Sequence, residues 1–163
     1  MTPANATNPP GRWIDSRALV RNSKGRVLMV EAAGGSGKLS LPGGFAEPNE
    51  APHEAAMRFT FMQSGIVTDC WRIVAVDHVP AEGEDAEGLV FVFGVPALPD
   101  FKAARVTAGL VQESGAVRAE WIDPAEITYQ TADDPGRVIE ALRVLDRPVG
   151  GLPLLVHGQP AGV

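Results

Sequence analysis

Residues 41–50 read Leu-Pro-Gly-Gly-Phe-Ala-Glu-Pro-Asn-Glu, a loop rich in proline and glycine that separates two patterns of apolar residues. Before the loop, Leu39–Leu41 is a short strand-like run. After it, strong helix formers predict a helix over Ala51–Ser64, and Asn49 can cap the start of that helix. Gly65 follows where a left-handed C-terminal cap is common. The segment therefore predicts a strand, a loop and a helix in close succession.

The same segment resembles the Nudix box, the signature of the Nudix (MutT-like) hydrolase superfamily. In that signature five residues separate a glycine from a glutamate and seven more precede an arginine, and Gly44, Glu50 and Arg58 keep this spacing. Gly65 and Ile66 close the box at the expected distance. The order of predicted strands and helices extends the resemblance over roughly residues 17–146.

The resemblance implies both a fold and a chemistry. The fold would be a Nudix-like α/β/α sandwich, of class α/β (α+β), with a mixed sheet between helices. In the family, glutamates of the box helix bind the Mg²⁺ or Mn²⁺ ions that assist hydrolysis of nucleoside diphosphate derivatives. The corresponding positions here hold Phe59, Met62 and Gln63. The box is therefore degenerate by this comparison, and ordinary metal-dependent hydrolysis is not expected.

The three replaced positions matter because residues i, i+3 and i+4 share one face of a helix. Carboxylates on that face make a hard oxygen site for Mg²⁺. A phenyl ring and a thioether offer no hard oxygen ligand, and an amide offers only a neutral carbonyl. We therefore expect neither a bound metal nor a cofactor. Mg²⁺ or Mn²⁺ is expected only if the site is rebuilt from other acids.

The replacements also suggest another use for this helix face. An apolar stripe on this face consists of Ala55, Phe59, Met62 and Ile66. The stripe predicts either a packed core face or an apolar wall for a ligand or partner. The candidates for ligand binding are the loop glycines, the replaced helix positions and a nearby lysine, namely Gly43, Gly44, Phe59, Met62, Gln63 and Lys38. Structural roles in the box are expected for Glu50, Arg58 and Gly65.

No catalytic residue follows from the sequence alone, but four side chains are candidates. Glu47 lies in the loop, where it could offer one weak metal contact. Glu50 stands at the position of the first glutamate of the box. Glu113 falls in the region where some members of the family place a further catalytic acid. His78 ends a predicted strand and is the acid–base candidate, because strand ends near the box line the family's cleft. A structural or surface role is the simpler expectation for each of them.

The rest of the chain alternates between strand and helix signals. Arg17–Arg21 and Arg26–Glu31 predict a hairpin around a turn at Asn22–Gly25. Three more strands are predicted at Trp71–Val79, Leu89–Val95 and Ala116–Ile122. A helical turn is predicted at Pro124–Ile127, and a second helix from Asp134 onward.

Length and charge bound the organisation and the partners. The chain has 163 residues, which suits one domain over residues 13–148, with a loose N-terminal arm at 1–12 and a tail at 149–163. The net charge of -6 and the absence of a basic cluster disfavour a nucleic-acid partner. No apolar stretch suits a membrane span, and the single cysteine, Cys70, favours a cytoplasmic location. The excess of arginine over lysine favours a bacterial source.

Three functions remain open at this stage. The first is a degenerate family member that keeps the cleft and binds a nucleotide-like or other small ligand. The second is a diphosphate hydrolase whose metal site is rebuilt around Glu47, Glu50, Glu54 and Glu113. The third is a repurposed, metal-free enzyme of a bacterial biosynthetic pathway. The expected partner is a small molecule, and a homodimer is compatible with the resemblance.

Overall fold

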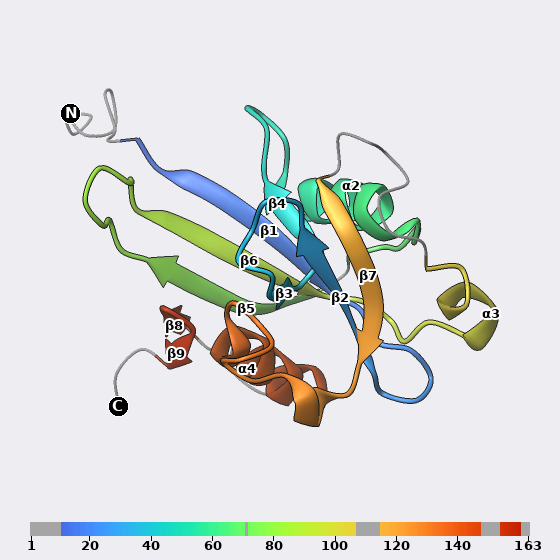
Figure 1. Cartoon of the computed structure of the whole chain (residues 1–163). Coiled ribbons are helices and arrows are strands. Elements are labelled where there is room, and N and C mark those ends of the chain that lie inside the picture. The colour runs from blue at the N-terminus through green and yellow to red at the C-terminus, as the bar shows by residue number, and fades with distance from the viewer. Residues whose placement is uncertain (1–10, 71, 107–114, 148–153, 161–163) are drawn as a thin grey trace.

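The computed structural model describes residues 11–70, 72–106, 115–147 and 154–160. These residues form two β-sheets, three α-helices and a short 3-10 helix (Figure 1). Along the chain the elements are β1 (Trp13–Leu19), β2 (Val27–Ala32), β3 (Leu39–Ser40), β4 (Gly43–Phe45), α2 (Pro52–Ser64), β5 (Arg72–Val79), β6 (Gly88–Gly94), α3 (Asp100–Ala103), β7 (Ala116–Ile122), η2 (Pro124–Glu126), α4 (Pro135–Leu145), β8 (Leu154–Val156) and β9 (Gln159–Pro160). None of the helices in these residues is long and apolar enough to cross a membrane.

The larger sheet is mixed, with the strand order β4-β1-β6-β5-β8-β9, and the smaller sheet has the order β3-β2-β7. In the larger sheet β1 runs antiparallel to β4 and parallel to β6, while β5 runs antiparallel to β6 and parallel to β8. Helix α2 packs against β1 and β4, whereas α4 packs against β5 (Figure 1). This arrangement confirms the predicted sandwich with a mixed sheet between helices.

Alternate side chains of β1 enter two different cores, because successive residues of a strand point to opposite faces. Leu19 joins the core on the side of α4, and Ala18 and Val20 join the core on the side of α2. Trp13, Asp15 and Arg17 therefore share the face of Leu19. This row of β1 leads from the edge of the molecule to the central cavity described below.

Helix α2 begins at Pro52 with Ala51 as its N-cap, so the predicted capping by Asn49 is wrong. Asn49 has a φ of 67° and forms part of the turn before the helix. The carboxylate of Glu54 instead accepts a hydrogen bond from the Ala51 N–H at 3.2 Å, which satisfies one free donor of the first turn. Gly65 ends the helix with a φ of 74°, and this confirms the left-handed cap.

The hairpin predicted between residues 17 and 31 forms only at its turn. The Asn22 N–H donates to the Arg26 carbonyl, and the Leu28 N–H donates to the Val20 carbonyl. Beyond these bonds the two strands separate, since β1 pairs with β4 and β6 while β2 pairs with β3 and β7. All of Val27–Val30 is buried. A strand buried on both faces needs apolar neighbours on each side, and its place in a second sheet supplies them.

Residues 154–160, within the segment predicted as a tail, form a hairpin that extends the larger sheet beside β5. At its turn the Gly158 N–H donates to both carboxylate oxygens of Asp77, each at 3.0 Å. Gly136 lies so close to the turn that a Cβ there would come within 2.6 Å of the Gly158 carbonyl oxygen. The hairpin therefore docks tightly on the start of α4. Neither this hairpin nor the short helix α3 was predicted from the sequence.

Candidate functional site

The loop between β4 and α2 is held against the helix by the side chains of Phe59 and Gln63. The ring of Phe59 lies against Gly44, where a Cβ would come within 2.5 Å of the ring. The Gln63 amide lies beside Gly43: its oxygen accepts from the Gly43 N–H at 2.8 Å, and its nitrogen donates to the Gly43 carbonyl at 3.0 Å. Both polar ends of the Gln63 amide are thus engaged, and the side chain is buried.

Glu50 and Arg58 brace the same loop from its other end. Arg58 Nε and Nη2 each donate to a carboxylate oxygen of Glu50 at 2.7 Å. The Glu47 N–H donates to Glu50 at 2.8 Å. The hydrogen bonds from Arg58 lower the pKa of Glu50, against the opposing effect of burial, and the Glu47 N–H adds to the lowering. The Arg58 guanidinium also lies 4.4 Å from the centre of the Phe59 ring, within cation–π distance.

Of the other candidate residues, Glu47 contacts this brace, whereas Met62, Lys38 and His78 form no hydrogen bond with it in the described part of the chain. Glu47 is largely exposed and its carboxylate is 3.9 Å from Arg58. Met62 is half-buried on α2, and Lys38 is half-buried just before β3. His78 pairs with Glu87 at 2.9 Å. Glu113 lies outside the residues that the structure describes. Their proposed ligand or catalytic roles stay predictions.

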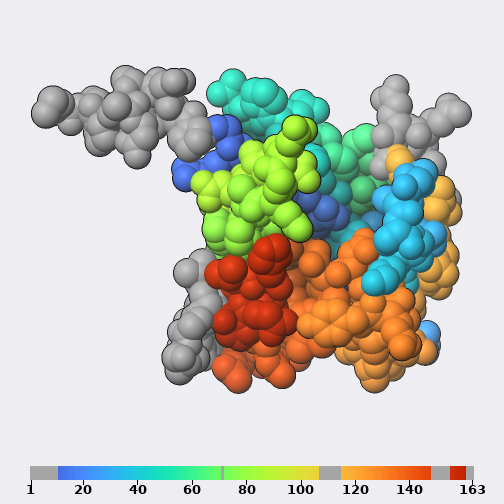
Figure 2. Space-filling model, turned by 60° about the vertical axis from the view of Figure 1, so that its left-hand side comes forward, coloured from blue at the N-terminus to red at the C-terminus, as the bar shows by residue number. Residues whose placement is uncertain are grey.

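A cavity of about 200 Å³ opens between the two sheets and the start of α4, and we call it the central cavity. Its apolar wall comes from β2, β3 and α4, and includes Leu39, Leu41 and Val138. Its polar groups are Arg17, Arg137, Asp133 and Asp134. Figure 2 shows this side of the molecule, hollowed between the yellow-green β5–β6 hairpin and the sky-blue loop before β3.

Both arginines of the central cavity are fixed by buried aspartates. Arg17 donates to the two carboxylate oxygens of Asp15 at 2.6 and 2.5 Å, and to the Leu41 carbonyl at 3.1 Å. Arg137 Nε and Nη2 lie 2.7 and 2.6 Å from Asp77, and its Nη1 donates to Asp134 at 2.8 Å. Asp15 is 5% exposed and Asp77 is fully buried. Ion pairing in a dry environment restricts the rotamers of both guanidinium groups.

The fixed arginines keep some hydrogen-bonding capacity. A guanidinium has five N–H donors, and three of those on Arg17 are engaged by Asp15 and Leu41. The remaining donors of Arg17 can serve a ligand. Asp133, which accepts from Ser36 Oγ at 2.7 Å, and Asp134 provide acceptors in the same lining. The cavity therefore offers both donors and acceptors next to an apolar surface.

Sequence reasoning missed the Asp77–Arg137 pair because its residues are far apart in the chain, and it also missed Asp15 and Arg17. Asp77 and Arg137 are separated by 60 residues. One local signal existed: Asp15 stands two residues before Arg17, at the start of the predicted strand Arg17–Arg21, so a strand extended to Asp15 would place both on one face. The candidates drawn from the box, by contrast, lie on the loop and α2.

The NUDIX domain family model matches residues 12–142 of the chain. A crystal structure of a MutT protein from Methanosarcina mazei is similar, with 21% identity and a TM-score of 0.65 over 83% of this chain and 94% of that chain. A MutT NUDIX hydrolase from Burkholderia pseudomallei has 16% identity and a TM-score of 0.66 over 82% and 99%. An ADP-ribose pyrophosphatase from Streptococcus suis has 12% identity and a TM-score of 0.60 over 88% and 98%. No curated protein sequence matches the chain. At these identities the structural likeness concerns the fold.

Proposed function

The chain belongs to the NUDIX domain family, and we propose that it binds a small, nucleotide-like ligand in the central cavity without the family's ordinary Mg²⁺-dependent hydrolysis. The observation that carries this proposal is the contact of Phe59 and Gln63 with the loop glycines. The Phe59 ring occupies the space against Gly44, and both the oxygen and the nitrogen of the Gln63 amide are hydrogen-bonded to Gly43.

The residues present at the box do not fit a divalent cation. Mg²⁺ requires hard oxygen ligands in near-octahedral geometry. The Gln63 side-chain oxygen already accepts from the Gly43 N–H, and the Gly43 carbonyl already accepts from the Gln63 amide nitrogen. Glu50 accepts from Arg58 and from the Glu47 N–H. Within the described part of the chain, no group of three or more His, Cys, Asp or Glu residues could hold a metal ion. A metal-assisted step is therefore not expected at this box.

The chemistry of the central cavity supports a ring ligand with both donors and acceptors. Asp133 and Asp134 can accept from N–H groups, while the free N–H groups of Arg17 can donate to ring nitrogens or carbonyls. Leu39 and Val138 offer an apolar surface for a planar face. Typical drug-sized pockets have roughly 300–1,000 Å³, so the cavity of about 200 Å³ suits one ring group of a larger ligand. A nucleobase has these properties.

A product assay tests the loss of hydrolysis. The purified protein is incubated with ADP-ribose, NADH, diadenosine polyphosphates and nucleoside triphosphates, with Mg²⁺ or Mn²⁺ and again with EDTA, and products are read by mass spectrometry. We expect no metal-dependent turnover near the roughly 1–10³ s⁻¹ of ordinary enzymes. Cleavage at such rates would contradict the proposal and favour a site rebuilt from other acids. Turnover that survives EDTA would favour a metal-free enzyme.

Calorimetric titration with the same compounds tests binding in the central cavity. The Asp133→Asn variant removes a charged acceptor and should weaken the binding of a nucleotide several-fold. Asp100→Asn is the matched control, because Asp100 is also an exposed aspartate that accepts from a serine hydroxyl, that of Ser23. Equal affinities of the two variants would place the ligand elsewhere. The absence of binding by the whole panel would overturn the nucleotide-like assignment.

A further inference from the structure

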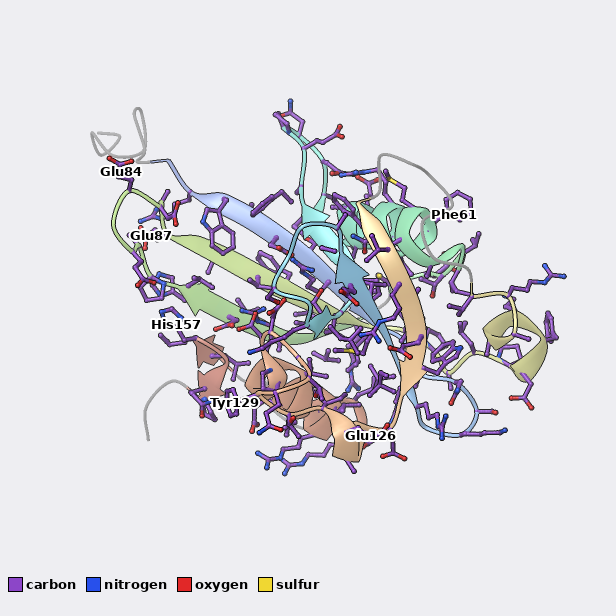
Figure 3. The ribbon with its side chains drawn as sticks, in the orientation of Figure 1. Phe61, Glu84, Glu87, Glu126, Tyr129 and His157 are labelled. Carbon is purple, nitrogen blue, oxygen red and sulfur yellow. The ribbon has the colours of Figure 1, made fainter. Side chains whose placement is uncertain are left out.

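A second cavity, of about 390 Å³, lies at the outer end of the β1 row, and we call it the aromatic cavity. Trp13, Phe45, Val79 and Pro80 form its apolar lining. Two acids of the β5–β6 hairpin, Glu82 and Asp85, also line it, together with His157 from the β8–β9 turn. Figure 3 shows Glu84 at the outer end of this hairpin, Glu87 nearer the sheet and His157 beside β8. This cavity is separate from the central cavity, with which it shares no lining residue.

The two rings of the aromatic cavity are held at a steep angle to each other. Their centroids are 5.6 Å apart, and the planes of Trp13 and Phe45 meet at 73°. The Trp13 indole rests on Gly88, where a Cβ would come within 2.0 Å of the ring, and its Nε1 donates to the Ala86 carbonyl at 2.7 Å. The indole is therefore fixed in place. Phe45 remains 60% exposed, so its ring is accessible to a ligand.

The carboxylates at the aromatic cavity differ in their pairing. Glu87 is engaged by His78 and Arg12, whose hydrogen bonds lower its pKa. Glu82 and Asp85 are joined to each other only through backbone hydrogen bonds. Among the described residues, neither carboxylate has a side-chain hydrogen bond or an ion pair. Two unpaired negative charges thus stand beside two aromatic rings.

We propose that the aromatic cavity binds the alkylated ammonium group of a small organic cation. Aromatic faces attract cations, and walls of aromatic rings with nearby carboxylates are suited to quaternary ammonium groups. A metal ion fits poorly because the cavity offers only two carboxylates and no further hard oxygen side chain. The methyl groups of an alkylated ammonium can pack on the faces of Trp13 and Phe45, where the N–H donors of a primary ammonium find no acceptor. The assignment is independent of the ligand in the central cavity.

Choline and its neutral isostere, 3,3-dimethylbutan-1-ol, test the proposal because they share shape but differ in charge. The readout is the indole N–H resonance of Trp13 in two-dimensional NMR spectra of the full chain, which has three tryptophans. A Trp13→Phe variant identifies the resonance by its loss. We expect choline to shift this resonance saturably in the millimolar range and the isostere to produce no saturable shift. Equal binding of the isostere, or no saturable shift with choline, would overturn the proposal.

Surface variants with matched controls separate the charges from the ring. Glu82→Gln combined with Asp85→Asn should weaken choline binding several-fold, whereas Glu84→Gln, on the same hairpin but outside the lining, should not. Phe45→Ala should abolish the saturable shift. Phe101→Ala is its control, since Phe101 is 66% exposed on α3. Unchanged choline affinity in the acid double variant or in Phe45→Ala would contradict the assignment.

Discussion

Gln63 satisfies the Gly43 peptide with both of its amide atoms, as an acceptor at 2.8 Å and as a donor at 3.0 Å. An ionised glutamate has only acceptors, so at this position it could serve the Gly43 N–H but would face the Gly43 carbonyl with a second acceptor. The amide needs no cation to hold the loop on the helix. At the scale of single residues, the Gln63 amide, the Phe59 ring and the Glu50–Arg58 brace therefore hold this loop on helix α2.

The Glu50–Arg58 brace should make stability depend on acidity. Arg58 lowers the pKa of Glu50 below its usual 4.5, so the native state holds the proton less tightly than the unfolded chain does. This contribution is complete above pH 4.5 and is lost as the pH falls through the lowered native pKa. The free energy of unfolding, measured by urea denaturation, should differ between wild type and Glu50→Gln by a constant amount near neutral pH, and the difference should shrink in acid.

Glu84→Gln controls for the general effect of removing one surface carboxylate. Glu84 is exposed and lies on the β5–β6 hairpin, away from the brace. Its difference from wild type should be small across the range. If the gap between wild type and Glu50→Gln widened as the pH fell, the ion pair would not be the cause.

At the scale of elements, the β8–β9 hairpin couples the end of the described chain to the wall of the central cavity. It pairs with β5, its turn bonds to Asp77, and Gln159 Nε2 donates to Tyr129 Oη at 3.2 Å. Gly136 lets the Gly158 turn approach the first turn of α4. Because Arg137 follows directly in α4, the hairpin helps to position one side of the cavity.

Gly136→Ala should destabilise the protein even though alanine is the better helix former. In an open helix this change would be favourable by about 0.8–1.0 kcal/mol. Here the new Cβ would come within 2.6 Å of the Gly158 carbonyl oxygen, so the hairpin must shift. We expect a lower free energy of unfolding and faster hydrogen exchange at the Gly158 N–H. Gly11→Ala, where nothing lies within 4 Å, is the neutral control. A stabilised Gly136→Ala variant would show that the contact relaxes without cost.

At the scale of the whole molecule, the hydrogen bonds of two arginines join segments that are distant in the chain. Asp77 of β5 holds Arg137 of α4 and also the Gly158 turn. Asp15 and Arg17 occupy one face of β1, where Arg17 also bonds to Leu41 between β3 and β4. The central cavity is thus assembled from both sheets and a helix. Loss of either buried acid would leave a cation in a dry environment.

Asp77→Ala should be strongly destabilising, because among the described residues it leaves the buried Arg137 with Asp134 as its one remaining acidic partner. Breaking one side of a buried ion pair commonly costs about 3–5 kcal/mol. The double variant Asp77→Ala, Arg137→Leu removes both charges and should recover part of that loss. Urea denaturation of the two single variants and the double variant forms a complete cycle. Strictly additive effects would mean that the two side chains stabilise the fold independently.

The sequence by itself determined the local parts of this protein. The helix after the loop and the cap at Gly65 follow from short-range rules of helix chemistry. The resemblance carried by Gly44, Glu50 and Arg58 implied the family's fold. The strand β7 was predicted with its observed bounds, Ala116–Ile122. These features depend on residues that are close in the chain, so a single sequence contains their cause.

Only the tertiary structure decided which distant residues meet. The separation of β1 and β2 into different sheets depends on burial of Val27–Val30 on both faces, which pairing rules for a hairpin do not include. The Asp77–Arg137 pair spans 60 residues, and the docking of β8–β9 requires the close approach of Gly136 and Gly158. The physical reason is that long-range packing and the pairing of buried charges select these contacts. Local propensity describes neither long-range packing nor the pairing of buried charges.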